Sequence, residues 1–150
     1  MKNFIILLII AVAAVAGYQY YQSEYGAYQT YKKFATTLFN GKWEEAQAMT
    51  TGAKAQAQFK VVESIYKRYY GNFRESPLGP KYVLLSKTKA LKGKMVNLTL
   101  TQTVRADLGG SVSIGGTGDV TFKHTASMVQ QGIQWKVQSL TCTYVPPSGR

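Results

Sequence analysis

The side chains that carry most enzyme and metal chemistry are scarce in this chain, which holds one histidine, His124, and one cysteine, Cys142. A single cysteine cannot form an intramolecular disulfide, and one cysteine with one histidine cannot complete a zinc site. A general base needs an orienting or complementary group beside it, and the sequence shows no such constellation around His124. We therefore expect no catalytic residue, no metal ligand and no cofactor.

His124 belongs to a stretch in which apolar and polar side chains alternate, as they do in a strand with one buried face. It shares the parity of the apolar residues of that stretch, which are Val120, Phe122, Ala126 and Met128. We expect its ring to point inward, either as a core or lining residue or as an acid–base group of a pocket. The carboxylates of Asp107 and Asp119 are expected in solvent.

A small set of residues could line an apolar pocket for a small ligand. The candidates are His124, Tyr82, Phe122 and Trp135. More often such residues are simply core residues that fill the space between strands and helices.

The elements that position these residues follow from the period of the apolar side chains, which changes from that of a helix to that of a strand after residue 80. We expect helices over residues 24–40, 43–49 and 53–70. We expect adjacent antiparallel strands over residues 82–91, 96–106, 119–129 and 133–145. Gly41 should hold the left-handed position after a helix, Gln131-Gly132 should form a tight turn, and the slipped alternation near Ser139-Leu140 predicts a bulge.

A glycine-rich segment over residues 108–118 separates the second and third expected strands. A phosphate-binding loop would lead from a strand into a helix and would carry a lysine followed by Ser or Thr. This segment leads into a strand and lacks the lysine, so we expect a long hairpin loop.

The N-terminal segment combines a positively charged start, an apolar run over residues 4–16 and a cluster of tyrosines. Small residues around Ala16 fit a signal-peptidase site, so cleavage there would release a secreted domain. We favour an uncleaved membrane anchor over residues 4–21, because no proline interrupts the stretch and tyrosines are typical of a membrane interface. The expected interface residues are Tyr18, Tyr20 and Tyr21.

The charges that flank this segment predict its orientation. Lys2 precedes the apolar run, and the next basic residue is Lys32. Basic residues favour the cytoplasmic side, so we expect the N-terminus in the cytoplasm and the domain in the periplasm, with the chain crossing a bacterial inner membrane once. Residues 1–22 would form the anchor or signal segment, and residues 23–150 one domain.

The net charge of +11 favours acidic partners such as nucleic acid, anionic lipid or an acidic protein surface. The basic residues are dispersed along the chain, and only residues 87–94 hold a dense group of lysines. These lysines alternate with other residues as a solvated strand and turn would. No nucleic-acid-binding motif accompanies the charge, so nucleic acid is not an expected partner.

Residues 34–46, FATTLFNGKWEEA, resemble the junction of helix, glycine, polar residue, aromatic residue, acidic residue and alanine that is frequent in the NTF2-like superfamily, also called cystatin-like or SnoaL-like. With a single span ahead of it, the chain resembles small bacterial envelope proteins, and distantly the VirB8-type scaffold of type IV secretion. The resemblance implies an α+β fold in which helices pack on a curved four-stranded antiparallel sheet. It also implies a cone-shaped sheet with a pocket at its open end and frequent dimers.

A fold of this kind does not settle function, because the superfamily includes enzymes, ligand-binding proteins and assembly modules. We expect a non-enzymatic, membrane-anchored module outside the cytoplasm that binds a protein partner or a second copy, as an accessory or scaffold subunit of an envelope complex. The alternative is a small-ligand-binding protein or enzyme that uses the cone pocket around His124.

Overall fold

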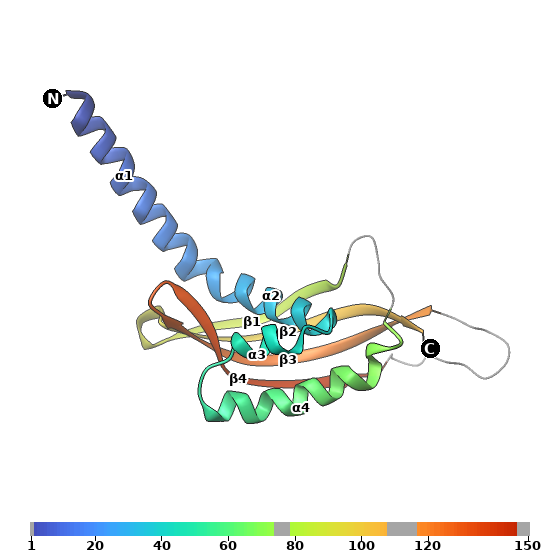
Figure 1. Ribbon diagram of the computed structural model, residues 1–150. Coiled ribbons are helices and arrows are strands. Elements are labelled where there is room, and N and C mark those ends of the chain that lie inside the picture. The colour runs from blue at the N-terminus through green and yellow to red at the C-terminus, as the bar shows by residue number, and fades with distance from the viewer. Residues whose placement is uncertain (1, 74–78, 108–116, 147–150) are drawn as a thin grey trace, which may run out of the picture.

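The computed structural model describes residues 2–73, 79–107 and 117–146. Figure 1 shows one long helix leaving a domain in which further helices cover one face of a curved antiparallel sheet. Of the loop expected over residues 108–118, only the last two residues are described, and they begin a strand. The remainder of that prediction lies outside the described residues.

A continuous helical rod forms the N-terminal third of the described chain. Its parts are α1 (Lys2–Tyr21), the π-helical turn η1 (Gln22–Gly26) and α2 (Ala27–Phe39). The side chains of residues 3–21 are exposed, and this helix is long and apolar enough to cross a membrane. At about 1.5 Å per residue, the 20 residues of α1 extend about 30 Å, which is the thickness of a hydrocarbon layer.

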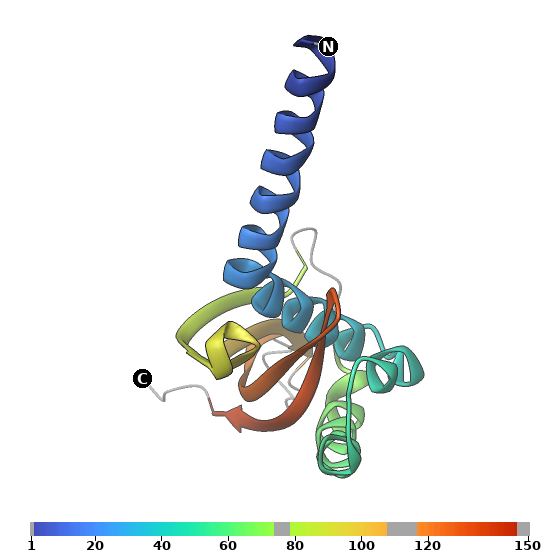
Figure 2. The same cartoon turned by 90° about the vertical axis from the view of Figure 1, so that its left-hand side faces the viewer.

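Four antiparallel strands form one sheet in the order β1-β2-β3-β4. The strands are β1 (Lys81–Ala90), β2 (Met95–Asp107), β3 (Thr117–Gln131) and β4 (Gln134–Val145). The pairing register shifts at Leu85 in β1 and at Gln138 in β4, so each strand carries one extra residue there. Such bulges increase the local twist, and Figure 2 shows how strongly the sheet curls. The bulge expected near Ser139-Leu140 is confirmed one residue earlier.

The core lies between the concave face of this sheet and the helices. On β2 and β3 every second side chain is buried, with the parity expected from the sequence. These residues pack against the buried stripes of α2 and α4 (Ala53–Tyr70), and α3 (Trp43–Ala48), between these two helices in the chain, adds Ala46 to the same core. Gly41 follows α2 with φ +72°, as expected, and the Tyr70 ring lies so close that a Cβ at Gly41 would collide with it. The α+β architecture is therefore the NTF2-like cone that the resemblance implies.

The β3–β4 turn differs from its prediction. Gly132, with φ +63°, and Ile133 form the turn, so β4 begins at Gln134 and not at Ile133. Glycine adopts this left-handed backbone without strain, and it takes the first turn position. The register places Ile133 at the tip of the hairpin, where 75% of its surface is exposed. An apolar residue that the sequence assigned to a strand therefore lies on the surface.

Candidate functional site

His124 lies at the centre of a buried polar chain that crosses the cone. Its ring is fully buried on β3 between a tyrosine of α2 and a tyrosine of α4. The hydroxyl of Tyr31 lies 3.0 Å from Nδ1, and the hydroxyl of Tyr66 lies 2.9 Å from Nε2. Both tyrosines are also fully buried. The imidazole is thus held on its two nitrogens by two helices.

Gln102 on β2 fixes the direction of these hydrogen bonds. Its amide nitrogen donates to the carbonyl of Ala35 at 3.1 Å and to the Tyr82 hydroxyl at 3.0 Å, so its oxygen Oε1 faces Tyr66 and accepts a hydrogen bond from that hydroxyl. Because the Tyr66 hydrogen is used there, its oxygen must accept from Nε2–H of His124. The imidazole therefore carries its proton on Nε2, and Nδ1 accepts from the Tyr31 hydroxyl.

The same direction continues to the end of the chain of hydrogen bonds. The Tyr82 hydroxyl accepts from Gln102 and donates to Oγ1 of Thr36 at 2.6 Å. Thr36 in turn donates to the carbonyl of Lys32 at 2.8 Å. In the described part of the chain, every buried side-chain nitrogen and oxygen has a hydrogen-bond partner. The network is complete, and one arrangement of protons satisfies all its members.

Burial keeps every titratable member of this network neutral. It lowers the pKa of His124 to about 3 and raises the pKa of Cys142, whose sulfur lies 3.9 Å from Nε2, to about 12. It also raises the pKa of Tyr31 and of Tyr66 well above the usual value of a tyrosine. A charged imidazole would have to lose its hydration, and among the described residues no carboxylate contacts the ring to compensate. Near neutral pH, this imidazole therefore does not take up a proton in the folded protein.

The structure brings together three of the four pocket candidates. His124 and Phe122 are fully buried, with the Phe122 ring stacked 4.9 Å from that of Tyr66, and Tyr82 is half-buried in the hydrogen-bond chain. Trp135 lies elsewhere, beside η1. The side chains of Tyr31, Tyr66 and Cys142 contact the His124 ring. That the four residues line a ligand pocket stays a prediction.

Sequence reasoning missed the partners that hold His124. Gln102 has the parity of the buried residues Leu100 and Val104, so a polar residue on an apolar face was the available signal. Tyr31 belongs to the expected apolar stripe of its helix, but nothing local shows that its hydroxyl faces a histidine. Of the two aspartates expected in solvent, Asp119 is exposed, whereas Asp107 is half-buried at the end of β2.

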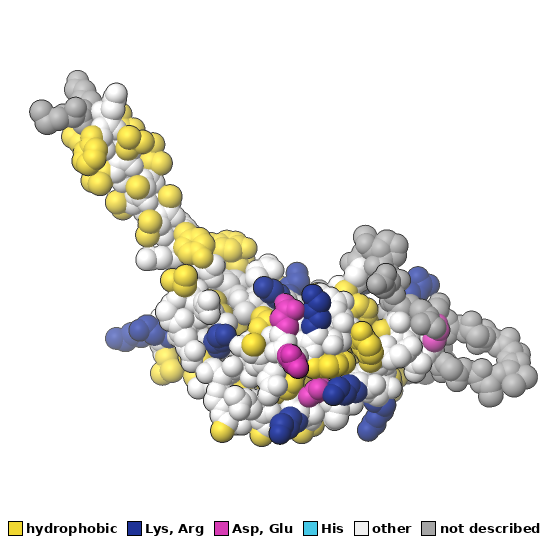
Figure 3. Space-filling view, in the orientation of Figure 1, with side chains coloured by type: hydrophobic (Ala, Val, Ile, Leu, Met, Phe, Trp, Pro, Cys, Tyr) yellow, Lys and Arg dark blue, Asp and Glu magenta, His cyan; other side chains and the backbone are white. Residues whose placement is uncertain are grey.

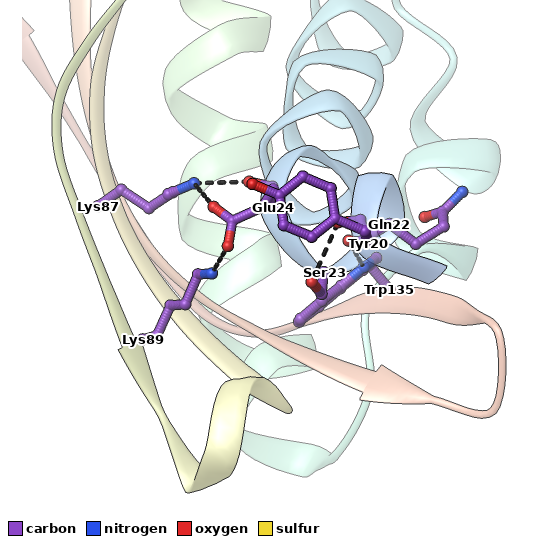
Figure 4. A network of polar contacts seen from close by, with 7 residues as sticks. All are labelled: Tyr20, Gln22, Ser23, Glu24, Lys87, Lys89 and Trp135. Atoms are coloured by element: carbon purple, nitrogen blue, oxygen red, sulfur yellow. Dashed lines mark hydrogen bonds and ion pairs between the residues drawn. The ribbon is translucent and has the colours of Figure 1, made fainter. Parts of the chain in front are cut away.

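A second cluster joins the domain to α1, and Figure 4 shows it from close by. The indole Nε1–H of Trp135 donates to the carbonyl of Gln22 at 3.1 Å. The π-helical turn η1 includes this residue, and in such a turn a carbonyl is freed from the regular helical pattern. Gly26 lets the ring approach, because a Cβ there would lie 2.7 Å from Nε1 of Trp135. One face of η1 is thereby fixed to β4.

The other face of η1 is fixed to β1 by charge. Lys87 donates to the backbone carbonyl of Glu24 at 2.6 Å and lies 3.6 Å from its carboxylate. Lys89 forms an ion pair and hydrogen bond with the same carboxylate. The hydrogen bond from Lys89, with the charges of both lysines, lowers the pKa of Glu24 against the opposing effect of burial. We call these contacts of Glu24, Lys87, Lys89, Gln22 and Trp135 the joint.

In the lysine-rich stretch 87–94, the joint changes the expectation of a solvated strand at Lys87 alone. Lys87 and Lys89 pair with Leu98 and Val96 across the ladder, so they lie on the concave side of β1, where Lys87 is half-buried and Lys89 is exposed. The inner face of β1 ends under η1, where it meets a carboxylate and not the apolar core. Lys92 and Lys94, at the tip of the β1–β2 hairpin, are exposed as expected.

The three expected interface tyrosines lie on the last turn of α1, just before the joint. Tyr18, Tyr20 and Tyr21 are exposed by 53%, 66% and 50%. The Tyr18 hydroxyl accepts a hydrogen bond from the Gln22 side chain at 3.1 Å. Their placement in a membrane interface stays a prediction.

No protein-family model and no curated protein matches this sequence. Solved structures do match: Aln2 from a Streptomyces species has a TM-score of 0.53 and 12% identity over 77% of this chain and 85% of its own. A putative calcium/calmodulin-dependent protein kinase II association domain from Xanthomonas campestris has a TM-score of 0.47 and 13% identity over 77% and 83%. The intermembrane space region of the chloroplast protein ARC6 has a TM-score of 0.46 and 10% identity over 83% and 96%. At these identities the likeness concerns the fold alone.

Proposed function

We propose that this NTF2-like domain is a membrane-anchored, non-enzymatic module that presents a protein-binding surface at a fixed position above the membrane. α1 crosses a bacterial inner membrane with its N-terminus in the cytoplasm, and the domain lies in the periplasm. The module serves as an accessory or scaffold subunit of an envelope complex. A domain released by cleavage near Ala16 is the competing arrangement.

The observation that carries this proposal is the continuity between α1 and the core. The rod from Lys2 to Phe39 has no loop in which the domain could swivel, and α2 is buried in the core. The joint holds η1 on two strands at once, through Trp135 on β4 and two lysines on β1. A flexible linker would suit a tethered enzyme that must find its substrate, whereas a fixed joint suits presentation of a surface.

The interior of the cone supports a role without catalysis. Its polar chain is fully satisfied and neutral, and a general base working near neutral pH needs a pKa in that range. The alternative function, a ligand or substrate at His124, would require Tyr31 or Tyr66 to leave its hydrogen bond with the ring.

We propose the outer edge of β1 as the surface that the partner contacts. β1 is an edge strand of the sheet, and its consecutive residues Val83, Leu84 and Leu85 are exposed by 57%, 37% and 53%. An edge strand with exposed apolar side chains can pair with an extended segment of another protein. The extra residue of the β1 bulge, Leu85, lies within this triplet.

Two measurements test the proposal in cells that express the full chain. The first is the intact mass of the protein that resists an alkaline wash of the membranes: a mass that includes residues 1–16 supports the anchor, and a soluble protein that begins at Gly17 refutes it. The second places a photo-crosslinking amino acid at Val83 or, as a matched control, at Val61 on α4, which is exposed by 61%. We expect a discrete crosslinked protein from position 83 only. Equal crosslinking, or none, would refute a partner at β1.

A further inference from the structure

The closed ends of the two β-hairpins lie at the end of the domain from which α1 leaves. Figure 1 shows both ends on that side, and Figure 2, seen from that side, shows them facing the reader beneath α1. A surface hollow is lined by Tyr18, Gln22 and Ser23 from the rod and by Gly132 and Ile133 from the β3–β4 tip. The tip of that hairpin therefore lies level with the last turn of α1.

A backbone hydrogen bond holds the tip of the β1–β2 hairpin next to the end of β3, near the last turn of α1. The backbone N–H of Gln130, which also lines that hollow, donates to the carbonyl of Lys94 at 2.9 Å. The turn itself contains Leu91 and Lys92, whose φ values of +51° and +56° are rare for residues other than glycine. This backbone is held at the end of a regular ladder, so its side chains project from a rigid support.

The side chains at the two tips combine apolar and basic groups. Ile133 is exposed by 75% and Leu91 by 66%, although turns in water usually carry polar residues. Lys92 and Lys94 are exposed beside Leu91. Figure 3 shows Lys or Arg side chains projecting next to hydrophobic ones at this end of the domain. Exposed aliphatic tips flanked by lysines match the boundary between acyl chains and anionic headgroups.

The length of α1 sets the height of these tips relative to a bilayer. The 20 residues of α1 extend about 30 Å, so a bilayer spanned from Lys2 onward ends near Tyr18 to Tyr21. In that placement Ile133, which shares a hollow with Tyr18, lies at the level of the headgroups. The joint prevents the domain from tilting away, which keeps the tips at a high effective concentration near the lipid.

We propose that the two hairpin tips, Leu91 with Lys92 and Lys94 on one side and Ile133 on the other, bind anionic phospholipid headgroups of the membrane that α1 spans. This inference rests on the proposed anchoring of α1. The domain is then seated on the bilayer at three places: the span and the two tips. Each lysine should favour the seated state on the order of fivefold on a strongly anionic surface, and salt should weaken that preference.

The test measures how close chosen positions of the full chain lie to lipid. The variants Ile133→Cys, Leu91→Cys, Val61→Cys and Tyr18→Cys are labelled one at a time with an environment-sensitive maleimide dye. Cys142 is buried and its thiol pKa is raised to about 12, so the native cysteine should not react. Each labelled chain is reconstituted into vesicles of phosphatidylcholine alone or of equal parts phosphatidylcholine and phosphatidylglycerol. Nitroxide-bearing lipids then quench any dye that reaches the bilayer.

We expect strong quenching at positions 18, 133 and 91 and little at 61, since Val61 is similarly exposed but lies on α4, away from α1. Quenching at position 91 should require phosphatidylglycerol, and the Lys92→Glu and Lys94→Glu changes together should reduce it severalfold. Quenching at position 18 without quenching at 133 and 91 would overturn the seated domain and leave the anchor intact. No quenching at position 18 would overturn the anchor and this inference with it. Equal quenching at position 91 in both vesicles would overturn the assignment to anionic lipid.

Discussion

Removing one hydroxyl from the buried hydrogen-bond network should lower the free energy of unfolding more at Tyr66 than at Tyr31. Tyr66→Phe leaves two buried groups unpaired: Oε1 of Gln102, and Nε2–H of His124, whose nearest alternative is the Cys142 sulfur at 3.9 Å. Tyr31→Phe leaves one, Nδ1 of His124. An unpaired buried group costs about 1–3 kcal/mol, so we expect a loss of about 2–6 kcal/mol for Tyr66→Phe and about 1–3 kcal/mol for Tyr31→Phe.

Urea unfolding of the full chain in mild detergent, followed by circular dichroism, measures this difference from the midpoints and slopes. Tyr70→Phe serves as the control: Tyr70 is exposed on the same helix as Tyr66, and its hydroxyl donates to the backbone carbonyl of Asn40 after α2, so the change should cost less than about 0.5 kcal/mol. Equal losses for Tyr31→Phe and Tyr66→Phe, or a larger loss for Tyr31→Phe, would refute the assigned direction of the hydrogen bonds. The single histidine allows a direct check, because its nitrogen NMR shifts should show a proton on Nε2.

The remaining predictions concern pH, the joint and the thiol. Between about pH 6.5 and about pH 3, His124 binds a proton in the unfolded state but not in the folded state. Lowering the pH should therefore reduce the free energy of unfolding by about 1.4 kcal/mol per pH unit. A free energy of unfolding that stays constant between about pH 6.5 and about pH 5, above the usual carboxylate range, would contradict this. Glu24→Gln should broaden the distance distribution between spin labels on α1 and β2, whereas Glu45→Gln, which removes an exposed ion pair on α3, should leave it unchanged. Gly26→Val should displace Trp135 and destabilise the domain by about 1–3 kcal/mol, while Gly17→Val, with nothing within 4 Å, should not; equal unfolding midpoints would refute the close approach. Maleimide should label Cys142 only in denaturant, and rapid labelling of the folded chain would show that the thiol is accessible.

Alternation was sufficient to predict the sheet and the inward position of His124. A strand that packs on one side repeats every two residues, so the parity of Phe122 and Met128 fixes that of the histidine between them. The long helix α4 was predicted with its observed bounds, because its apolar stripe ends at Gly71. These features depend on residues that are close together within one element, so the local sequence is sufficient to predict them.

The joint could not be predicted in this way, because its partners are distant in sequence. Glu24 and Lys89 lie 65 residues apart, and only the fold brings β1 under η1. Two lysines on the inner side of a strand also contradict the usual rule that an inner face is apolar. The role of Gln102 could not be predicted for the same reason, because it forms hydrogen bonds with Tyr66 and Tyr82 from two other elements.

The unbroken rod also fixes how α1 is rotated about its own axis relative to the sheet. One residue added to or removed from residues 22–26 would turn α1 by about 100° around its axis and shift it by about 1.5 Å, with the sheet left in place. The azimuth of every side chain on α1 is therefore fixed relative to β1 and β4. A second membrane helix that packs against one side of α1 would therefore have a single rotational orientation relative to the domain. The packing of helices inside the bilayer would then determine which edge of the sheet faces each neighbouring protein outside the bilayer.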